Sequence, residues 1–284
     1  MKIISALERL PKATLKITIT IPWSAIKKVY EKVLEKKVKE VEISGFRKGK
    51  APLSLAKKQI AKEPLLKETL QEILPEIYTE AIKEHQLKPI VQPKIQIIVM
   101  DENKDWQLTA TTCEEPKVSL KNYQEEIKNT LKAPKILIPG KEEKEEKISE
   151  SEKTQKLFEV LLKATKIELP QILIEDETSR LLSSFLDQIN KLGLTLDSYL
   201  NSVKKTAEQI RKEHQERAER VLKLEFILEA IADDLKIEVQ EKEIDELIEK
   251  TIKTKEEKKK IKINKYYFAS ILRRQKTLDK LLNL

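Results

Sequence analysis

The chain has 284 residues, of which 37% are charged and 39% are hydrophobic. At about 150 residues per domain this length predicts two domains, and the share of apolar residues excludes a disordered chain. Only four glycines and 5% aromatic residues argue against β-sandwiches, barrels and glycine-rich dinucleotide folds. The composition therefore predicts a globular protein that is mostly helical overall.

The sequence carries no pattern typical of a membrane or secreted protein. Its best apolar run, Ile95–Met100, is interrupted by Gln96 and falls short of the about 18 residues that a spanning helix needs. The N-terminus reaches Glu8 before a signal-peptide core forms, and Cys113, the single cysteine, cannot form an internal disulfide. We therefore expect a cytoplasmic protein without a membrane partner.

The net charge of +8 is distributed unevenly. Residues 22–62 hold twelve Lys and Arg against four Glu, and residues 251–284 hold eleven against three Asp and Glu. Each of these segments carries +8, so the remainder of the chain sums to −8. Such segregation predicts local basic surfaces that attract phosphate or acidic protein.

The first 116 residues show strand patterns at both ends and helical patterns between them. Alternation of polar and apolar side chains predicts the strands, and apolar residues at three- and four-residue spacing predict amphipathic helices. Pro75 interrupts one helical pattern and predicts a bend there. We assign residues 1–116 to an α+β domain. The expected elements are strands at 3–7 and 16–21, helices at 26–41, 52–62 and 64–82, and a hairpin of strands at 94–100 and 106–112.

The rest of the sequence predicts a connection followed by helices. Residues 117–150 contain elements too short to make a core and a run rich in Lys and Glu, so we expect a connecting arm and charged linker. Residues 151–284 read as an all-α domain. In it Thr206 and Gln209 have capping-box spacing, and Gly193 marks a helix end. The expected helices are at 157–162, 170–193, 195–200, 206–235, 244–252 and 266–282.

No residue pattern predicts a catalytic, cofactor or metal site. His85 and His214 lack the spacing that places two metal ligands on one helix face, so each is interpreted as a surface or cap residue. Acidic neighbours raise the pKa of a thiol, so Cys113 beside Glu114 and Glu115 is interpreted as a packed strand residue. A glycine-rich phosphate loop is missing as well. We expect a protein that is not an enzyme and uses no cofactor.

One loop between two expected helices stands apart from the rest of the sequence. Residues 44–52 read SGFRKGKAP and place Phe46 and three cations around two glycines. An ordinary helix connection explains this composition equally well. However, the glycines allow a tight tip on which Phe46 anchors an interface and Arg47 binds a carboxylate or phosphate. The loop is therefore a candidate docking tip.

This loop, following a strand and a basic helix, resembles the signature loop of bacterial trigger factor, a chaperone family of the ribosomal tunnel exit. The similarity covers residues 1–116 and returns at 167–170 and 191–195, which resemble the family's carboxy-terminal domain. The resemblance implies an α+β ribosome-binding domain followed by an all-α, arm-bearing chaperone domain. It implies that the loop binds a tunnel-exit ribosomal protein and nearby rRNA. The implied ribosome-binding residues are Gly45, Phe46, Arg47, Lys48, Gly49, Lys50 and Pro52.

The sequence departs from the family pattern in one respect. Family members normally carry an FKBP-type prolyl isomerase domain between the two parts, and residues 117–150 are too few to hold it. No Phe, Trp or Tyr lies between Tyr123 and Phe158 to form its aromatic pocket. The resemblance therefore implies a chaperone without isomerase activity, acting without ATP on nascent or unfolded polypeptides during folding or export.

Three alternatives remain open at this point. The first is a basic ribosome- or RNA-binding assembly factor without chaperone activity, the second a periplasmic chaperone, which needs a signal peptide, and the third an isomerase. Client-binding residues are not predicted, because Tyr266, Tyr267 and Phe268 fit packing as well as binding. The sequence makes no prediction of oligomeric state.

Overall fold

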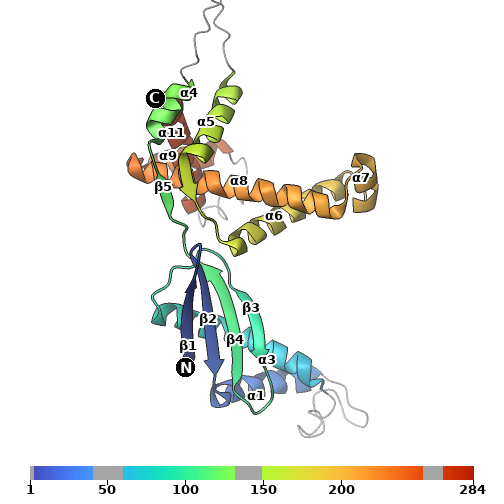
Figure 1. Ribbon diagram of the computed structural model, residues 1–284. Helices are drawn as coiled ribbons and strands as arrows, with labels where there is room; N and C mark the ends of the chain where they lie inside the picture. Colours follow the sequence, from blue (N-terminus) through green and yellow to red (C-terminus); the bar gives the residue numbers. More distant parts are fainter. Residues whose placement is uncertain (1–2, 41–59, 132–148, 252–264) are drawn as a thin grey trace, which may run out of the picture. The chain divides into compact units, whose positions relative to one another are not determined.

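The structure is a computed structural model that describes residues 3–40, 60–131, 149–251 and 265–284 (Figure 1). The chain divides into two compact units, which we describe separately. Helices dominate the described residues, as predicted. The units are Met1–Glu115 with Pro170–Leu173, and Pro116–Leu169 with Ile174–Leu284.

A four-stranded antiparallel sheet, with two helices on one face, forms the first unit (Figure 1). The strand order β1-β2-β4-β3 places β1 and β3 at the edges among the described strands. The predicted strands, the hairpin and the two long helices are confirmed. The elements are β1 (Ile4–Leu10), β2 (Thr14–Ile21), α1 (Trp23–Glu40), α3 (Lys62–Glu84), β3 (Lys94–Val99) and β4 (Trp106–Cys113).

The core of this unit lies between the sheet and the helices. Every second residue of β2 is buried, because successive side chains of a strand point to opposite faces. The register continues this apolar layer into β4, where Ile17 pairs with Ala110 and Ile19 pairs with Leu108. From the helices, the buried side chains include Ile26, Val33, Leu34, Leu65, Leu70, Ile73 and Ile77.

The second unit is helical apart from a small two-stranded sheet, which the sequence analysis did not predict. Its elements in chain order are β5 (Val118–Leu120), α4 (Tyr123–Leu131), α5 (Glu150–Ala164), β6 (Thr165–Ile167), α6 (Gln171–Lys191), α7 (Leu196–Val203), α8 (Ala207–Asp234), α9 (Glu241–Thr251) and α11 (Lys265–Leu282).

Residues 118–131 belong to the core of this unit, whereas the sequence analysis placed them in the connecting arm. β5 pairs with β6, from Val118 opposite Ile167 to Leu120 opposite Thr165. From α4, Ile127 is fully buried. The short elements looked too small for a core because their partners in α5, α8 and α11 are distant in sequence. The side chains packed together there include Tyr123, Ile127, Leu157, Leu161, Ile227, Ile231 and Leu281.

Three helices, α6, α7 and α8, form an arm of the second unit that carries α7 at its tip (Figure 1). Phe185 of α6 contacts Tyr199 of α7 and His214 of α8, with ring centroids 5.1 and 5.0 Å apart. The predicted helix end is confirmed by Gly193, which follows α6 with φ of +72°. The predicted capping box is confirmed by Thr206 and Gln209 at the start of α8.

Candidate functional site

The residues of the candidate docking loop lie outside the described part of the chain, so the structure positions only the helices on either side of it. These helices are α1, which ends at Glu40, and α3, which begins at Lys62. The loop residues predicted to bind a partner are Gly45, Phe46, Arg47, Lys48, Gly49, Lys50 and Pro52.

Two ion pairs join the end of α1 to α3. Lys37 Nζ lies 2.9 Å from Glu68 Oε2, and Lys36 pairs with Glu72. The earlier lysine, Lys36, pairs with the later glutamate, Glu72, so α1 and α3 run antiparallel. The end of α1 and the start of α3 are therefore neighbours, and residues 41–61 connect them. The hydrogen bond to Glu68 raises the pKa of Lys37, and the hydrogen bond from Lys36 lowers the pKa of Glu72.

Aromatic side chains fix the other end of α1 to the sheet. The ring centroid of Trp23 lies 5.5 Å from that of Tyr30 and 6.4 Å from that of Trp106. The Trp23 amide donates to Asp105 Oδ1 at 2.8 Å, and the Trp106 indole donates to the Asp101 carbonyl at 2.9 Å. Helix α1 is therefore anchored at both ends by contacts with described residues outside the loop.

The basic character of α1 is partly neutralised by neighbouring acids. Lys36 and Lys37 face carboxylates of α3, and Lys27 lies 3.9 Å from Glu31 one turn further along α1. Paired cations attract phosphate less than isolated ones. These three lysines therefore offer less charge to a partner than the sequence count alone suggests.

Several cations of the second basic segment, all on α11, are engaged within the chain, whereas the lysines at 253–262 lie outside the described residues. Arg273 of α11 pairs with Asp233 at 2.5 Å and donates to the Ile237 carbonyl at 3.0 Å. Arg274 lies 2.6 Å from Glu225, and Lys276 lies 2.6 Å from Glu243. These cations hold α11 against α8 and α9, which weakens the interpretation of this helix as an RNA-binding surface.

The histidines and the cysteine occupy structural positions. His85 caps α3, as predicted, and its Nε2 lies 2.8 Å from Ser5 Oγ. His214 is not a cap, because it lies within α8; its ring is partly exposed and its Nδ1 lies 2.8 Å from the Ile210 carbonyl. Cys113 is fully buried in β4, as predicted.

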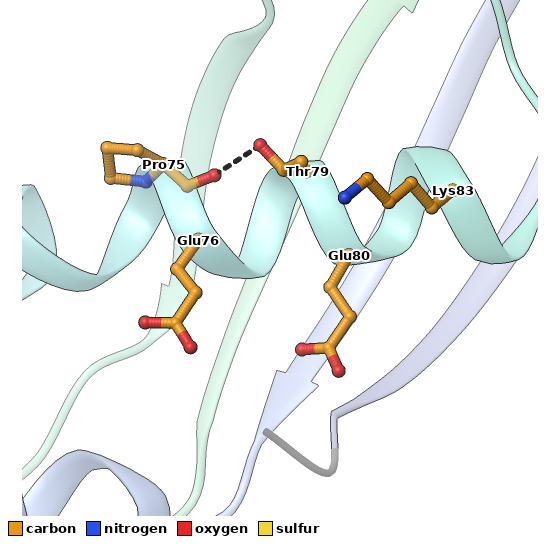
Figure 2. A pocket seen from close by; sticks show the side chains of 5 residues that line it. All are labelled: Pro75, Glu76, Thr79, Glu80 and Lys83. Atoms are coloured by element: carbon orange, nitrogen blue, oxygen red, sulfur yellow. Dashed lines mark hydrogen bonds between the residues drawn. The ribbon is translucent and has the colours of Figure 1, made fainter.

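The hollow drawn in Figure 2 lies along the surface of α3, and residues of this one helix line it. Pro75, Glu76, Thr79, Glu80 and Lys83 line it. Thr79 Oγ1 donates to the Pro75 carbonyl at 2.7 Å, so the hydroxyl serves the helix itself. Within the described ranges, no cluster of three or more His, Cys, Asp or Glu is placed to hold a metal ion. None of the helices described is long and apolar enough to cross a bilayer.

Family models of bacterial trigger factor match both parts of the chain. The model of bacterial trigger factor protein covers residues 3–151, and the model of its C-terminus covers residues 140–283. This chain belongs to the trigger factor family. The two matches overlap, so no middle domain separates them.

Curated relatives and a solved structure agree with this assignment. Trigger factors of Staphylococcus epidermidis and Staphylococcus aureus are 33% identical to this chain over 108 residues, which is 38% of this chain and 25% of the relative. The aligned segment thus spans a quarter of the length of these curated relatives. A solved trigger factor chaperone, described for promiscuous substrate recognition in folding and assembly, matches with a TM-score of 0.61 at 14% identity. It covers 98% of this chain and 99% of its own. That likeness shows a shared fold.

The sequence did not predict the ion pairs that hold α1 and α3 together beside the loop. Lys36 and Lys37 were interpreted as part of an exposed basic face, because the lysine spacing on α1 says nothing about its neighbour. The four-residue spacing of Glu68 and Glu72 on α3 was the available signal. It places two carboxylates on one face of a helix, where two adjacent lysines of an antiparallel neighbour meet them.

Proposed function

We propose that this trigger factor family member is a chaperone that docks at the ribosomal tunnel exit and shields nascent polypeptides without ATP. The observation that carries the proposal is the continuous match of both family parts, with the loop sequence GFRKGKAP lying between α1 and α3. In this proposal Phe46, Arg47 and Lys48 contact a ribosomal protein, with Phe46 and Arg47 giving specificity. The basic helix and loop are also attracted to rRNA phosphate. The protein acts in the cytoplasm.

Exposed apolar side chains of the second unit support client binding there. Leu192 is 75% exposed just after α6, and Tyr266 and Tyr267 of α11 are 92% and 60% exposed. Phe268 instead packs on the cluster around Ile244. Dispersed apolar contacts bind an unfolded chain weakly at many points, and the client's own folding then competes for the same apolar surface.

Suppression of aggregation tests the chaperone part of this proposal. The purified full chain is added without nucleotide to a chemically unfolded client that aggregates on dilution, and light scattering is followed. Suppression that rises with chaperone concentration supports the proposal, and scattering equal to that with serum albumin contradicts it. A prolyl isomerase assay on a tetrapeptide should give the uncatalysed rate, because no isomerase domain separates the matched parts.

The basic RNA-binding factor remains the alternative function. The cations of α11 argue against it, since Arg273, Arg274 and Lys276 bind acids of the same unit. Tight binding to naked RNA together with no effect on aggregation would favour this alternative.

A further inference from the structure

The edge strand β3 carries a run of exposed apolar side chains. Ile97, Ile98 and Val99 are 43%, 53% and 37% exposed. Other large aliphatic side chains exposed in the described part of the first unit, Ile4 and Ile90, lie apart from this run. Single exposed aliphatic residues are ordinary on soluble proteins, whereas three in succession on an edge strand form a surface that another chain can cover.

The two edges of the sheet differ in charge. On β1, Glu8 and Arg9 are exposed, and charged side chains are a common protection of edge strands against pairing. On β3 no residue from Ile95 to Met100 is charged. β3 carries one exposed charge, Lys94 at its start, but the rest of the strand lacks the charged side chains that Glu8 and Arg9 supply within β1.

A bulge limits the regular part of this edge. The register with β4 passes from Ile97 opposite Leu108 to Val99 opposite Gln107, so Ile98 is the extra residue. The bulge ends the regular ladder, which leaves Lys94 to Ile97 as the part of the strand in regular antiparallel register. The exposed Ile98 side chain extends the apolar surface beyond the ladder.

A surface hollow continues the apolar edge past the end of β3. Leu66 of α3 and Met100 supply its apolar part. Its five charged lining residues are paired: Lys104 lies 2.9 Å from Asp101, Lys62 lies 3.9 Å from Glu102, and Glu63 lies 2.7 Å from Lys67 outside the hollow. An apolar side chain entering the hollow therefore meets no uncompensated charge from these pairs.

The position of this surface indicates what covers it. The hollow includes Lys62, where α3 begins, so it lies at the end of the unit to which the docking loop is attached. A second copy of this chain is a poor occupant, because two molecules of net charge +8 repel one another. An uncharged segment of an emerging polypeptide avoids that repulsion and matches the uncharged run from Ile95 to Met100.

We propose that β3 accepts an extended, uncharged, apolar segment of a nascent polypeptide as a fifth strand of the sheet, with a following apolar side chain in the hollow over Leu66 and Met100. This proposal rests on the proposed chaperone function and names one client class for the first unit. Strand addition uses main-chain hydrogen bonds, which are the same for every sequence, and the side chains of Ile97 and Ile98 select apolar partners.

A synthetic peptide tests strand addition without ribosomes. The probe is a fluorescent peptide of alternating valine and threonine, and its binding to the full chain is followed by fluorescence anisotropy. The control peptide has the same side chains but an N-methyl group on every residue, which removes the donors on both edges. The proposal expects the methylated peptide to bind at least about tenfold more weakly, since two or more main-chain hydrogen bonds are lost. Equal affinity of the two peptides would overturn it.

Matched variants locate the bound peptide. Ile98→Lys should weaken binding about tenfold or more, while Ile4→Lys on the opposite edge should leave it unchanged. Both side chains are exposed, so circular dichroism should show intact folding. If Ile98→Lys instead converts a dimer to a monomer in analytical ultracentrifugation and peptide affinity is unaltered, a second copy occupies the edge and the proposal is wrong. Either failure leaves aggregation suppression as a separate result, so the general chaperone proposal is judged independently.

Discussion

Lys37 Nζ lies 2.9 Å from Glu68 Oε2, and this contact joins α1 to α3 beside the segment that carries the candidate docking loop. Lys37 also lies 3.5 Å from Glu40, so its ammonium group bridges both helices. Residues 41–61, which include the loop, thus connect two helices that are joined by contacts outside that segment. Changes within the loop leave these ion pairs in place, which makes loop variants informative.

The Lys37–Glu68 contact should couple the two helices energetically. We expect Lys37→Ala and Glu68→Ala each to lower the thermal midpoint, and the double variant to lose less than the sum of the two. The coupling should weaken in high salt, because both side chains are about one third exposed. Thermal unfolding of the four proteins measures it. The Lys27–Glu31 pair, which lies within α1, is the matched control. If the losses in thermal midpoint from Lys37→Ala and Glu68→Ala simply add in the double variant, the ion pair does not couple the two helices.

The packing of residues 118–131 makes α4 essential to the second unit. Ile127 is fully buried, so Ile127→Ala should destabilise this unit by about 2–5 kcal/mol through lost burial and a residual cavity. Tyr123→Phe removes the 2.7 Å hydrogen bond to Asp234 and the 3.2 Å hydrogen bond accepted from Gln124 Nε2, and should cost about 1–2 kcal/mol. Urea unfolding followed by circular dichroism measures both. An Ile127→Ala protein as stable as the parent would mean that this segment is a connection and not part of the core.

The arginines of α11 should contribute to stability rather than to nucleic-acid binding. Arg273→Ala loses the contact to Asp233 and the hydrogen bond to the Ile237 carbonyl, which together should cost about 1 kcal/mol because the site is partly exposed. Lys280→Ala, in the last turn of the same helix, is the charge-matched control and should change little. RNA affinity measured by filter binding should be equal for the two variants, and a selective loss in Arg273→Ala would favour the RNA-binding alternative.

Glu114 makes the first unit sensitive to acid. The Lys88 amide donates to Oε1 at 3.1 Å and Arg9 lies 3.0 Å from Oε2, and these contacts lower the pKa of Glu114 from its ordinary value of 4.5. A lowered folded-state pKa gives stability that is present above about pH 4.5 and is lost as the pH falls through the folded value.

Glu114→Gln should therefore reduce stability at neutral pH and flatten its decline on acidification. The neighbouring exposed Glu115→Gln is the control. Chemical unfolding at a series of pH values between neutrality and pH 3 measures the effect. If the stability of Glu114→Gln falls with pH as steeply as that of the parent, this carboxylate does not cause the loss of stability in acid.

The sequence predicted those elements whose pattern reflects a single buried face. The alternation in β2 and the capping box at Thr206 depend on neighbours in sequence, and both are confirmed. The β5–β6 sheet was missed because Val118 and Ile167 meet only after α4 and α5 fold between them. Each of the two strands has three residues, which is too short for a periodic pattern.

The residues of the candidate site could be predicted from the sequence, but the ion pairs that join the helices on either side of it could not. The glycines, Phe46 and the cations of the docking loop are visible in the sequence, whereas its base depends on Glu68 and Glu72 meeting lysines of α1. Exposure was the least predictable property. Ile97 and Ile127 are equally apolar, yet Ile97 is 43% exposed at a sheet edge and Ile127 is fully buried.

Ribosome co-sedimentation tests the central claim most directly. The parent chain, the Phe46→Ala/Arg47→Ala/Lys48→Ala variant and the charge-matched Lys28→Ala/Lys39→Ala variant of α1 are compared at low and moderate salt. We predict that the parent and the α1 variant sediment with ribosomes, that salt weakens both, and that the loop variant stays in the supernatant with unchanged helical content. Equal sedimentation of the loop variant and the parent would contradict docking through this loop.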